Sequence, residues 1–157
     1  DYRASVRDKS DIKNMILPVL RNVCLINKKF DSTTEKDLSE ILENTAGVLK
    51  WFKPNNDRAK EIFNIKYPDD EHQLHNYLPD FIVETIDGKY MIETKASNQM
   101  TDKTVQAKKS AALKWCEIAT DFEKKHNGKS WHYLLIPDNT ITLDRSFEKL
   151  VRDYEAK

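Results

Sequence analysis

The chain has 157 residues, of which 39% are hydrophobic and 33% are charged, so it fits one globular domain and is not a disordered polymer. Its 26 basic and 26 acidic residues balance, which excludes a strongly basic protein that coats nucleic acid through its overall charge. No stretch approaches the about 20 apolar residues of a transmembrane helix. Two distant cysteines, Cys24 and Cys116, make neither a disulfide framework nor a CxxC zinc motif, so we expect a cytoplasmic protein.

We interpret residues 1–157 as a single domain, with an N-terminal helical segment over about residues 1–30 and a core over about residues 31–157. Apolar residues at spacings of three and four predict an amphipathic helix from about Asp11 to Asn27. The chain begins without an initiating Met, so we expect it to be a fragment of a larger protein.

The core region shows a succession of helix and strand patterns. Ser32 followed by Glu35 fits a capping box and predicts a second helix that runs to about Trp51. Alternating apolar residues over 63–67 predict a strand, and a polar loop is expected over 68–76. Later segments predict a helix over about 102–125, a buried strand over 131–136 and a last helix over 146–154. The order predicts a mixed α/β domain built on a small sheet.

A β-hairpin is predicted between the loop and the long helix. Two β-rich runs, residues 81–83 and 90–92, flank Asp87-Gly88, which is a preferred filling of a two-residue hairpin turn. This turn predicts three facing pairs, which are Ile86 with Lys89, Ile82 with Glu93, and Asp80 with Lys95. Because side chains alternate between faces, the apolar residues gather on one face and form the expected core face.

The other face of the hairpin carries Asp80, Glu93 and Lys95 at the end away from the turn. Asp80 and Glu93 are expected as diagonal neighbours, with α-carbons roughly 7–8 Å apart. Two carboxylates at this spacing can converge on Mg²⁺, which prefers oxygen ligands. Lys95 could then orient an attacking water or neutralise charge on a phosphate. The alternative is a half-buried hairpin whose charged face is solvated.

Two further charged residues are placed by helical periodicity. Glu35 lies about 50° from the centre of the apolar stripe of its helix, so it is the inward-facing glutamate. It could be the capping partner of Ser32, a residue of the site, or both. Lys108 falls inside the apolar stripe of the long helix, where its ammonium group must either extend to solvent or find an anion.

The two acids and the lysine form a recognisable pattern. Pro79-Asp80 and Glu93-Thr94-Lys95, with twelve residues between the two acids, resemble the PD-(D/E)XK nuclease superfamily. A longer phrase is similar to the C-terminal endonuclease domain of the Res subunit of type III restriction-modification enzymes. It comprises residues 50–54, 77–83, 91–95, Lys108, Ala111-Ala112, Trp115-Cys116 and 133–137. The resemblance covers about residues 30–150.

The resemblance implies a restriction-endonuclease-like fold, in which helices flank a small central mixed sheet. It implies Mg²⁺-dependent hydrolysis of phosphodiester bonds in double-stranded DNA, with Mn²⁺ able to substitute. The implied catalytic residues are Asp80, Glu93 and Lys95, together with Glu35 as an acid on the helix before the sheet. Lys108 is added as a catalytic candidate because its position in the apolar stripe could bring it to the scissile phosphate or to the acids. The implied metal ligands are Asp80, Glu93, the backbone carbonyl of Thr94 and, for a second ion, Glu35.

The same resemblance implies partners. An ATP-driven helicase or translocase would lie upstream in the Res chain, and a methyltransferase (Mod) subunit would recognise the DNA site in the prokaryotic cytoplasm, in defence against viruses. The sequence has no GxxxxGK phosphate loop, so ATP would act only through that absent motor. Two alternatives remain open, namely a non-catalytic module with the nuclease fold and a related DNA repair or resolvase nuclease.

Overall fold

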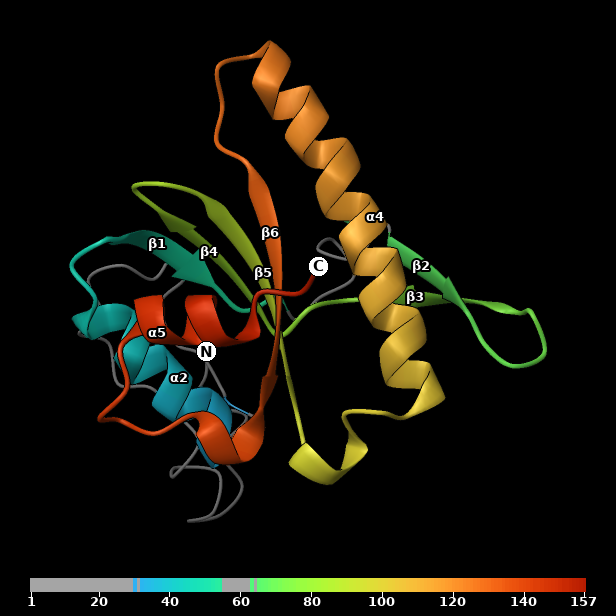
Figure 1. The fold of residues 1–157 in the computed structure, drawn as a ribbon, viewed down its shortest axis with the longest axis horizontal. Helices are drawn as coiled ribbons and strands as arrows, with labels where there is room; N and C mark the ends of the chain where they lie inside the picture. Colours follow the sequence, from blue (N-terminus) through green and yellow to red (C-terminus); the bar gives the residue numbers. More distant parts are fainter. Residues whose placement is uncertain (1–29, 31, 55–62, 64) are drawn as a thin grey trace, which may run out of the picture.

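The computed structural model describes residues 30, 32–54, 63 and 65–157. The helix predicted from Asp11 to Asn27, and nearly all of the N-terminal helical segment, lie outside these residues. Figure 1 shows the described elements arranged around one twisted sheet.

The central sheet has four strands in the order β1-β4-β5-β6. These are β1 (Val48–Phe52), β4 (Phe81–Thr85), β5 (Lys89–Lys95) and β6 (Trp131–Pro137). The β1–β4 and β4–β5 pairs are antiparallel and the β5–β6 pair is parallel. A separate antiparallel hairpin pairs β2 (Ile65–Pro68) with β3 (Leu74–Tyr77).

Helices lie on both faces of this sheet. They are α2 (Thr33–Asn44), α4 (Lys103–Lys125) and α5 (Phe147–Tyr154), with short 3-10 turns η2 (Ser97–Gln99) and η3 (Asp138–Thr140). In Figure 1, α4 runs beside β6 and the β2–β3 hairpin, whereas α2 and α5 lie together on the other side. The prediction of a small mixed sheet flanked by helices is confirmed.

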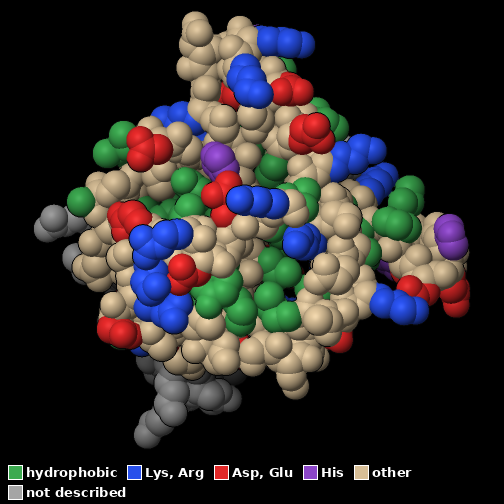
Figure 2. All heavy atoms as spheres, in the orientation of Figure 1, with side chains coloured by type: hydrophobic (Ala, Val, Ile, Leu, Met, Phe, Trp, Pro, Cys, Tyr) green, Lys and Arg blue, Asp and Glu red, His purple; other side chains and the backbone are tan. Residues whose placement is uncertain are grey.

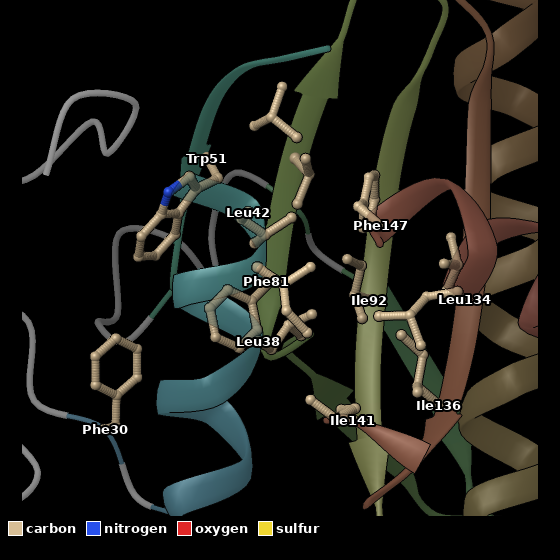
Figure 3. Close-up of a cluster of buried hydrophobic side chains, with 14 residues drawn as sticks. Phe30, Leu38, Leu42, Trp51, Phe81, Ile92, Leu134, Ile136, Ile141 and Phe147 are labelled. Atoms are coloured by element: carbon tan, nitrogen blue, oxygen red, sulfur yellow. The ribbon is translucent and has the colours of Figure 1, made fainter. Parts of the chain in front are cut away.

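Two hydrophobic cores correspond to the two faces. The first joins α2 and α5 to the sheet through buried residues such as Leu38, Phe81, Ile92 and Phe147, which Figure 3 shows between the helices and the strands. The second packs α4 and the β2–β3 hairpin on the opposite face, where Met91 is fully buried. Both faces of β5 are therefore covered. The alternative of a hairpin whose charged face is solvated does not describe β5.

The second helix is shorter than predicted. It ends at Asn44, and β1 begins at Val48, where the sequence pattern predicted a helix to Trp51. Thr45 adopts an extended backbone, and its hydroxyl donates to the carbonyl of Ile41. Residues Val48–Phe52 then pair with β4, and this pairing outweighs the apolar periodicity that had extended the helix.

The segment expected to be a polar loop contains a strand. Residues Leu74–Tyr77 form β3, and its partner β2 starts at Ile65, two residues later than the predicted start. The Asp69 carboxylate closes the connection by accepting from the backbone N–H groups of Glu71 and Gln73. The sequence pattern did not predict β3, because its residues are mostly polar and only the Tyr77 side chain is buried.

The central hairpin forms as predicted, but its turn lies one residue earlier. The observed pairs are Phe81 with Ile92, Ile82 with Met91, Val83 with Tyr90, and Glu84 with Lys89. The predicted pairing of Ile82 with Glu93 is therefore wrong by two residues. Thr85 accounts for the shift, because its side chain and backbone both bond to Gly88 across the turn. A two-residue shift leaves every side chain on its predicted face.

The long helix, the last strand and the last helix agree with the sequence patterns within one residue. Ser146 caps α5 by accepting from the backbone N–H of Lys149. The connection β5–α4–β6 brings β6 back parallel to β5, which places α4 over the sheet beside the end of β5.

Candidate active site

Asp80 directly precedes β4 and closes the open end of the hairpin. Strand β5 extends beyond its last pair with β4, which is Phe81 with Ile92, so the backbone N–H of Thr94 has no partner in β4. The Oδ2 atom of Asp80 accepts from this N–H and from the Thr94 hydroxyl, both at 2.8 Å. Continuing the observed register by one residue places Asp80 opposite Glu93. The two acids are thus direct neighbours rather than the diagonal neighbours predicted.

Glu93 is a buried carboxylate on the face covered by α4, with only 8% of the residue exposed. Its Oε2 atom accepts from the Tyr77 hydroxyl at 3.0 Å, and its Oε1 atom lies 3.8 Å from the Lys108 ammonium group. Burial, followed by the negative charge of Asp80, raises the pKa of Glu93 to about 7. Two acids that repel each other in this way form a site where a cation is favoured.

Lys95 follows Glu93 by two residues and therefore lies on the same face of β5. Its positive charge opposes the rise in the pKa of Glu93. In the described part of the chain its side chain forms no ion pair, although it is only partly exposed. A lysine in this position keeps its ammonium group available for a substrate or water.

Lys108 reaches the acids from α4 instead of extending only to solvent. Its ammonium group lies 3.8 Å from Glu93 and over the rings of Tyr67 and Tyr77, at 5.8 and 5.6 Å from their centroids. Both rings belong to the β2–β3 hairpin, so this hairpin surrounds the Lys108 ammonium group with aromatic faces.

Glu35 is turned inward, as its helical position predicted. The Ser32 hydroxyl accepts from the Glu35 backbone N–H at 3.1 Å, and the buried Glu35 carboxylate accepts from the Lys53 ammonium group at 2.7 Å. Lys53 follows β1, and continuing the β1–β4 register places it opposite Phe81, next to Asp80 in sequence. Glu35 therefore lies toward the same end of the sheet as the two acids.

Sequence reasoning missed three polar residues of this region. Tyr77 and Tyr133 lie under Glu93, with their hydroxyl oxygens 3.4 Å apart, and Lys53 pairs with Glu35. Burial raises the pKa of both tyrosines above its usual range. Both tyrosines and Lys53 fall within the phrases of the family resemblance, but nothing in their spacing distinguishes them from ordinary core or surface residues.

The described residues contain no group of three or more His, Cys, Asp or Glu side chains placed to hold a metal ion. The oxygen pair of Asp80 and Glu93 nevertheless fits Mg²⁺, which proteins usually hold by one or two carboxylates together with water and substrate phosphate. The Thr94 N–H points toward Asp80. The Thr94 carbonyl leaves the strand on that same side, because both groups of a strand residue point the same way.

Comparison with known families agrees with a nuclease. Residues 55–120 match the family model described as TnsA-like endonuclease N terminal, a PD-(D/E)XK-type nuclease family. The matched segment contains Asp80, Glu93, Lys95 and Lys108, whereas Glu35 precedes it. No curated protein matches the chain. The small mixed sheet with its flanking helices is compatible with a restriction-endonuclease-like fold.

No helix among the residues that the structure describes combines the length and apolar character needed to cross a lipid bilayer.

Proposed function

We propose that the chain is a divalent-metal-dependent endonuclease domain that hydrolyses phosphodiester bonds of double-stranded DNA. The observation that carries the proposal is the pairing of Asp80 and Glu93 at one end of β4 and β5, with Lys95 beside them. This constellation lies inside the segment that matches a nuclease family model.

Asp80 and Glu93 would hold Mg²⁺, or Mn²⁺ in its place, with the Thr94 carbonyl as a third protein ligand. Such an ion supplies a bound water of lowered pKa and stabilises the charge that develops on the phosphate. Hydrogen bonds from Thr94 occupy Oδ2 of Asp80, which leaves Oδ1 for the ion. Glu35 would contribute only to a second ion, and its ion pair with Lys53 would have to open for this.

The protein's own cations complete the proposed site. Lys95 would orient the attacking water and neutralise charge on the scissile phosphate, because it follows Glu93 on the same face of β5 and forms no ion pair in the described residues. Lys108 would balance the charge of Glu93 before DNA and metal bind.

We further propose that the parent protein is the Res subunit of a type III restriction-modification enzyme, with one nuclease domain over residues 1–157. An upstream motor would hydrolyse ATP, and a Mod subunit would recognise the DNA site. The proposal rests on the sequence phrases around Asp80, Glu93 and Lys108, and it places the enzyme in the prokaryotic cytoplasm in defence against viruses.

The family match favours a second candidate. The matched model is described as TnsA-like endonuclease N terminal, so the chain could serve as a TnsA-like endonuclease outside a type III enzyme. Such a nuclease would share the Asp80–Glu93–Lys95 chemistry but would require neither a Mod subunit nor the motor of a Res chain.

Nicking of supercoiled plasmid by the purified chain in Mg²⁺ or Mn²⁺ tests the proposed chemistry. We expect Asp80→Asn and Lys95→Ala each to reduce the rate at least about 100-fold. Asp87→Asn in the exposed hairpin turn and Lys103→Ala at the exposed start of α4 are matched controls that should keep the wild-type rate. Equal rates in all five proteins would show a contaminating nuclease.

The same assay separates the two candidates. A type III subunit should need the Mod subunit, its motor and ATP for efficient cutting, and Asp80→Asn should abolish that cutting. Efficient cutting that is indifferent to ATP and Mod would favour the TnsA-like candidate. Wild-type protein that is inactive both alone and in the assembled enzyme would contradict the nuclease proposal and favour a non-catalytic module.

A further inference from the structure

Tyr77 lies at the end of β3, where it contacts two charged groups of the proposed site. The residue is only 2% exposed. Its hydroxyl donates to Oε2 of Glu93 at 3.0 Å, and its ring lies beneath the Lys108 ammonium group at 5.6 Å from Nζ to the centroid. One side chain therefore contacts both the buried acid and the cation that α4 provides.

Tyr133 of β6 is the second polar neighbour of the Tyr77 hydroxyl. It is 1% exposed, and its hydroxyl oxygen lies 3.4 Å from that of Tyr77. Buried hydroxyl groups are normally hydrogen-bonded, and here each phenol provides a partner for the other. The polar chain runs from β6 through β3 to Glu93 on β5, inside the core that α4 covers.

The two oxygens of Glu93 consequently have different neighbours. Oε2 accepts from Tyr77, whereas Oε1 faces Lys108 at 3.8 Å. The terminal torsion of a glutamate is broad when nothing restrains it, so a carboxylate readily changes the direction of its oxygens. Rotation of Glu93 would break the bond to Tyr77, which therefore restrains the carboxylate.

We propose that Tyr77 is a positioning residue whose hydroxyl fixes the Glu93 carboxylate in the orientation that binds the divalent metal ion. The inference rests on the proposed function and adds to it a residue outside the acid–lysine motif. In this role the Tyr77 hydroxyl acts through Glu93, whereas its ring contacts Lys108. Loss of a group that hydrogen-bonds a ligating carboxylate typically weakens metal binding by about 10- to 100-fold.

Calorimetric titration of the purified chain with Mn²⁺ tests the inference without any cleavage reaction. We expect Tyr77→Phe to weaken Mn²⁺ binding by about 10-fold, because it removes the hydroxyl and keeps the ring beneath Lys108. Tyr67→Phe is the matched control, since the Tyr67 ring also lies near Lys108, at 5.8 Å. This control should bind Mn²⁺ with wild-type affinity.

A kinetic measurement separates positioning from general loss of structure. In Tyr77→Phe, the Mg²⁺ concentration for half-maximal nicking should rise about 10-fold, while the rate at saturating Mg²⁺ changes much less. Tyr133→Phe keeps the hydroxyl that bonds Glu93 and removes only its support, so we expect a smaller loss of Mn²⁺ affinity. Thermal denaturation shows whether each variant is folded.

Wild-type Mn²⁺ affinity in Tyr77→Phe would overturn the inference, as would equal weakening in Tyr67→Phe. Should thermal denaturation show Tyr77→Phe to be unfolded at the titration temperature, the titration is repeated at a lower temperature at which the variant is folded, and wild-type affinity there would overturn the inference. A wild-type chain that binds no Mn²⁺ would overturn the proposed function itself, so the two failures are distinguishable.

Discussion

The buried carboxylate of Glu93, which is a proposed metal ligand, destabilises the metal-free fold when it is charged. Its ordinary pKa of 4.5 rises to about 7 in the folded chain, because burial and Asp80 disfavour the charged form. The folded state therefore holds this proton more tightly than the unfolded state does. The stabilisation from the proton is complete below pH 4.5 and is lost as the pH rises through 7. At alkaline pH the metal-free fold carries a buried charge that disfavours it.

Glu93→Gln should stabilise the metal-free chain at pH 8 by up to about 3 kcal/mol, because the amide remains neutral and can still accept from Tyr77. The gain should shrink markedly at pH 5, where the native glutamate is itself protonated. Urea denaturation in the presence of a chelator measures both values.

Glu84→Gln in the same hairpin is the control for this prediction. Hydrogen bonds from Lys129 and the neighbouring Lys50 lower the pKa of Glu84, so its shift has the opposite sign. This variant should not stabilise the chain at pH 8. A Glu93→Gln variant with the same stability change at pH 5 and pH 8 would refute the assigned cause.

At the scale of the elements, one buried ion pair joins α2 to the end of β1. Lys53 and Glu35 lie 2.7 Å apart, and their side chains are 5% and 8% exposed. Their contact lies toward the end of the sheet where Asp80 lies. A buried charge that loses its counter-charge destabilises a fold far more than an exposed one does.

Lys53→Met should therefore lower the free energy of unfolding by about 3 kcal/mol, because it removes the buried ion pair with Glu35. Lys36→Met removes an exposed pair with Glu40 within α2 and should change it by less than about 0.5 kcal/mol. Urea denaturation compares the two variants, and the double variant Lys53→Met with Glu35→Leu should recover much of the loss. Similar small effects of both single variants would contradict a structural role for the pair.

Other elements of the site meet only in three dimensions. Strand β5 provides Glu93, β3 provides Tyr77, and α4 provides Lys108. The β2–β3 hairpin also contacts α4, and this contact keeps Tyr67 and Tyr77 beside Lys108. A change in the position of this hairpin would be transmitted to Glu93 through the Tyr77 hydroxyl.

The whole molecule has a formal net charge of zero, from 26 basic and 26 acidic residues. Figure 2 shows blue and red side chains interspersed over the drawn face, without a broad field of one sign. Affinity for the DNA backbone depends mainly on the number of phosphates that lysine and arginine neutralise. A molecule with this distribution of charge should bind DNA weakly by itself.

The isolated chain should therefore bind a short duplex no more tightly than about 1 μM at physiological salt, as measured by fluorescence anisotropy. Fusion to a sequence-specific DNA-binding module should raise nicking of a plasmid that contains the module's site by at least about 10-fold, through effective concentration. A plasmid without the site and a fusion carrying Asp80→Asn are the controls. Tight binding by the unfused chain would contradict the argument from charge.

Local sequence patterns were enough to predict the α/β class, the hairpin and the shared face of Asp80, Glu93 and Lys95. These features are local, because strand alternation and a turn dipeptide place side chains on a face whatever lies beyond them. A turn displaced by one residue left those faces unchanged. The prediction of a helix to Trp51 was wrong, because strand pairing of residues Val48–Phe52 with β4 outweighed the local periodicity.

The groups that contact the acids come from segments that are distant in the chain and meet only in the folded protein. Tyr77 and Glu93 are 16 residues apart in sequence, and Tyr77 and Tyr133 are 56 apart, so no spacing pattern connects them. The register set by Thr85 made Asp80 and Glu93 direct neighbours, and the crossover through α4 brought Lys108 to them. Burial on this face, which depends on packing between distant segments, is what raises the Glu93 pKa.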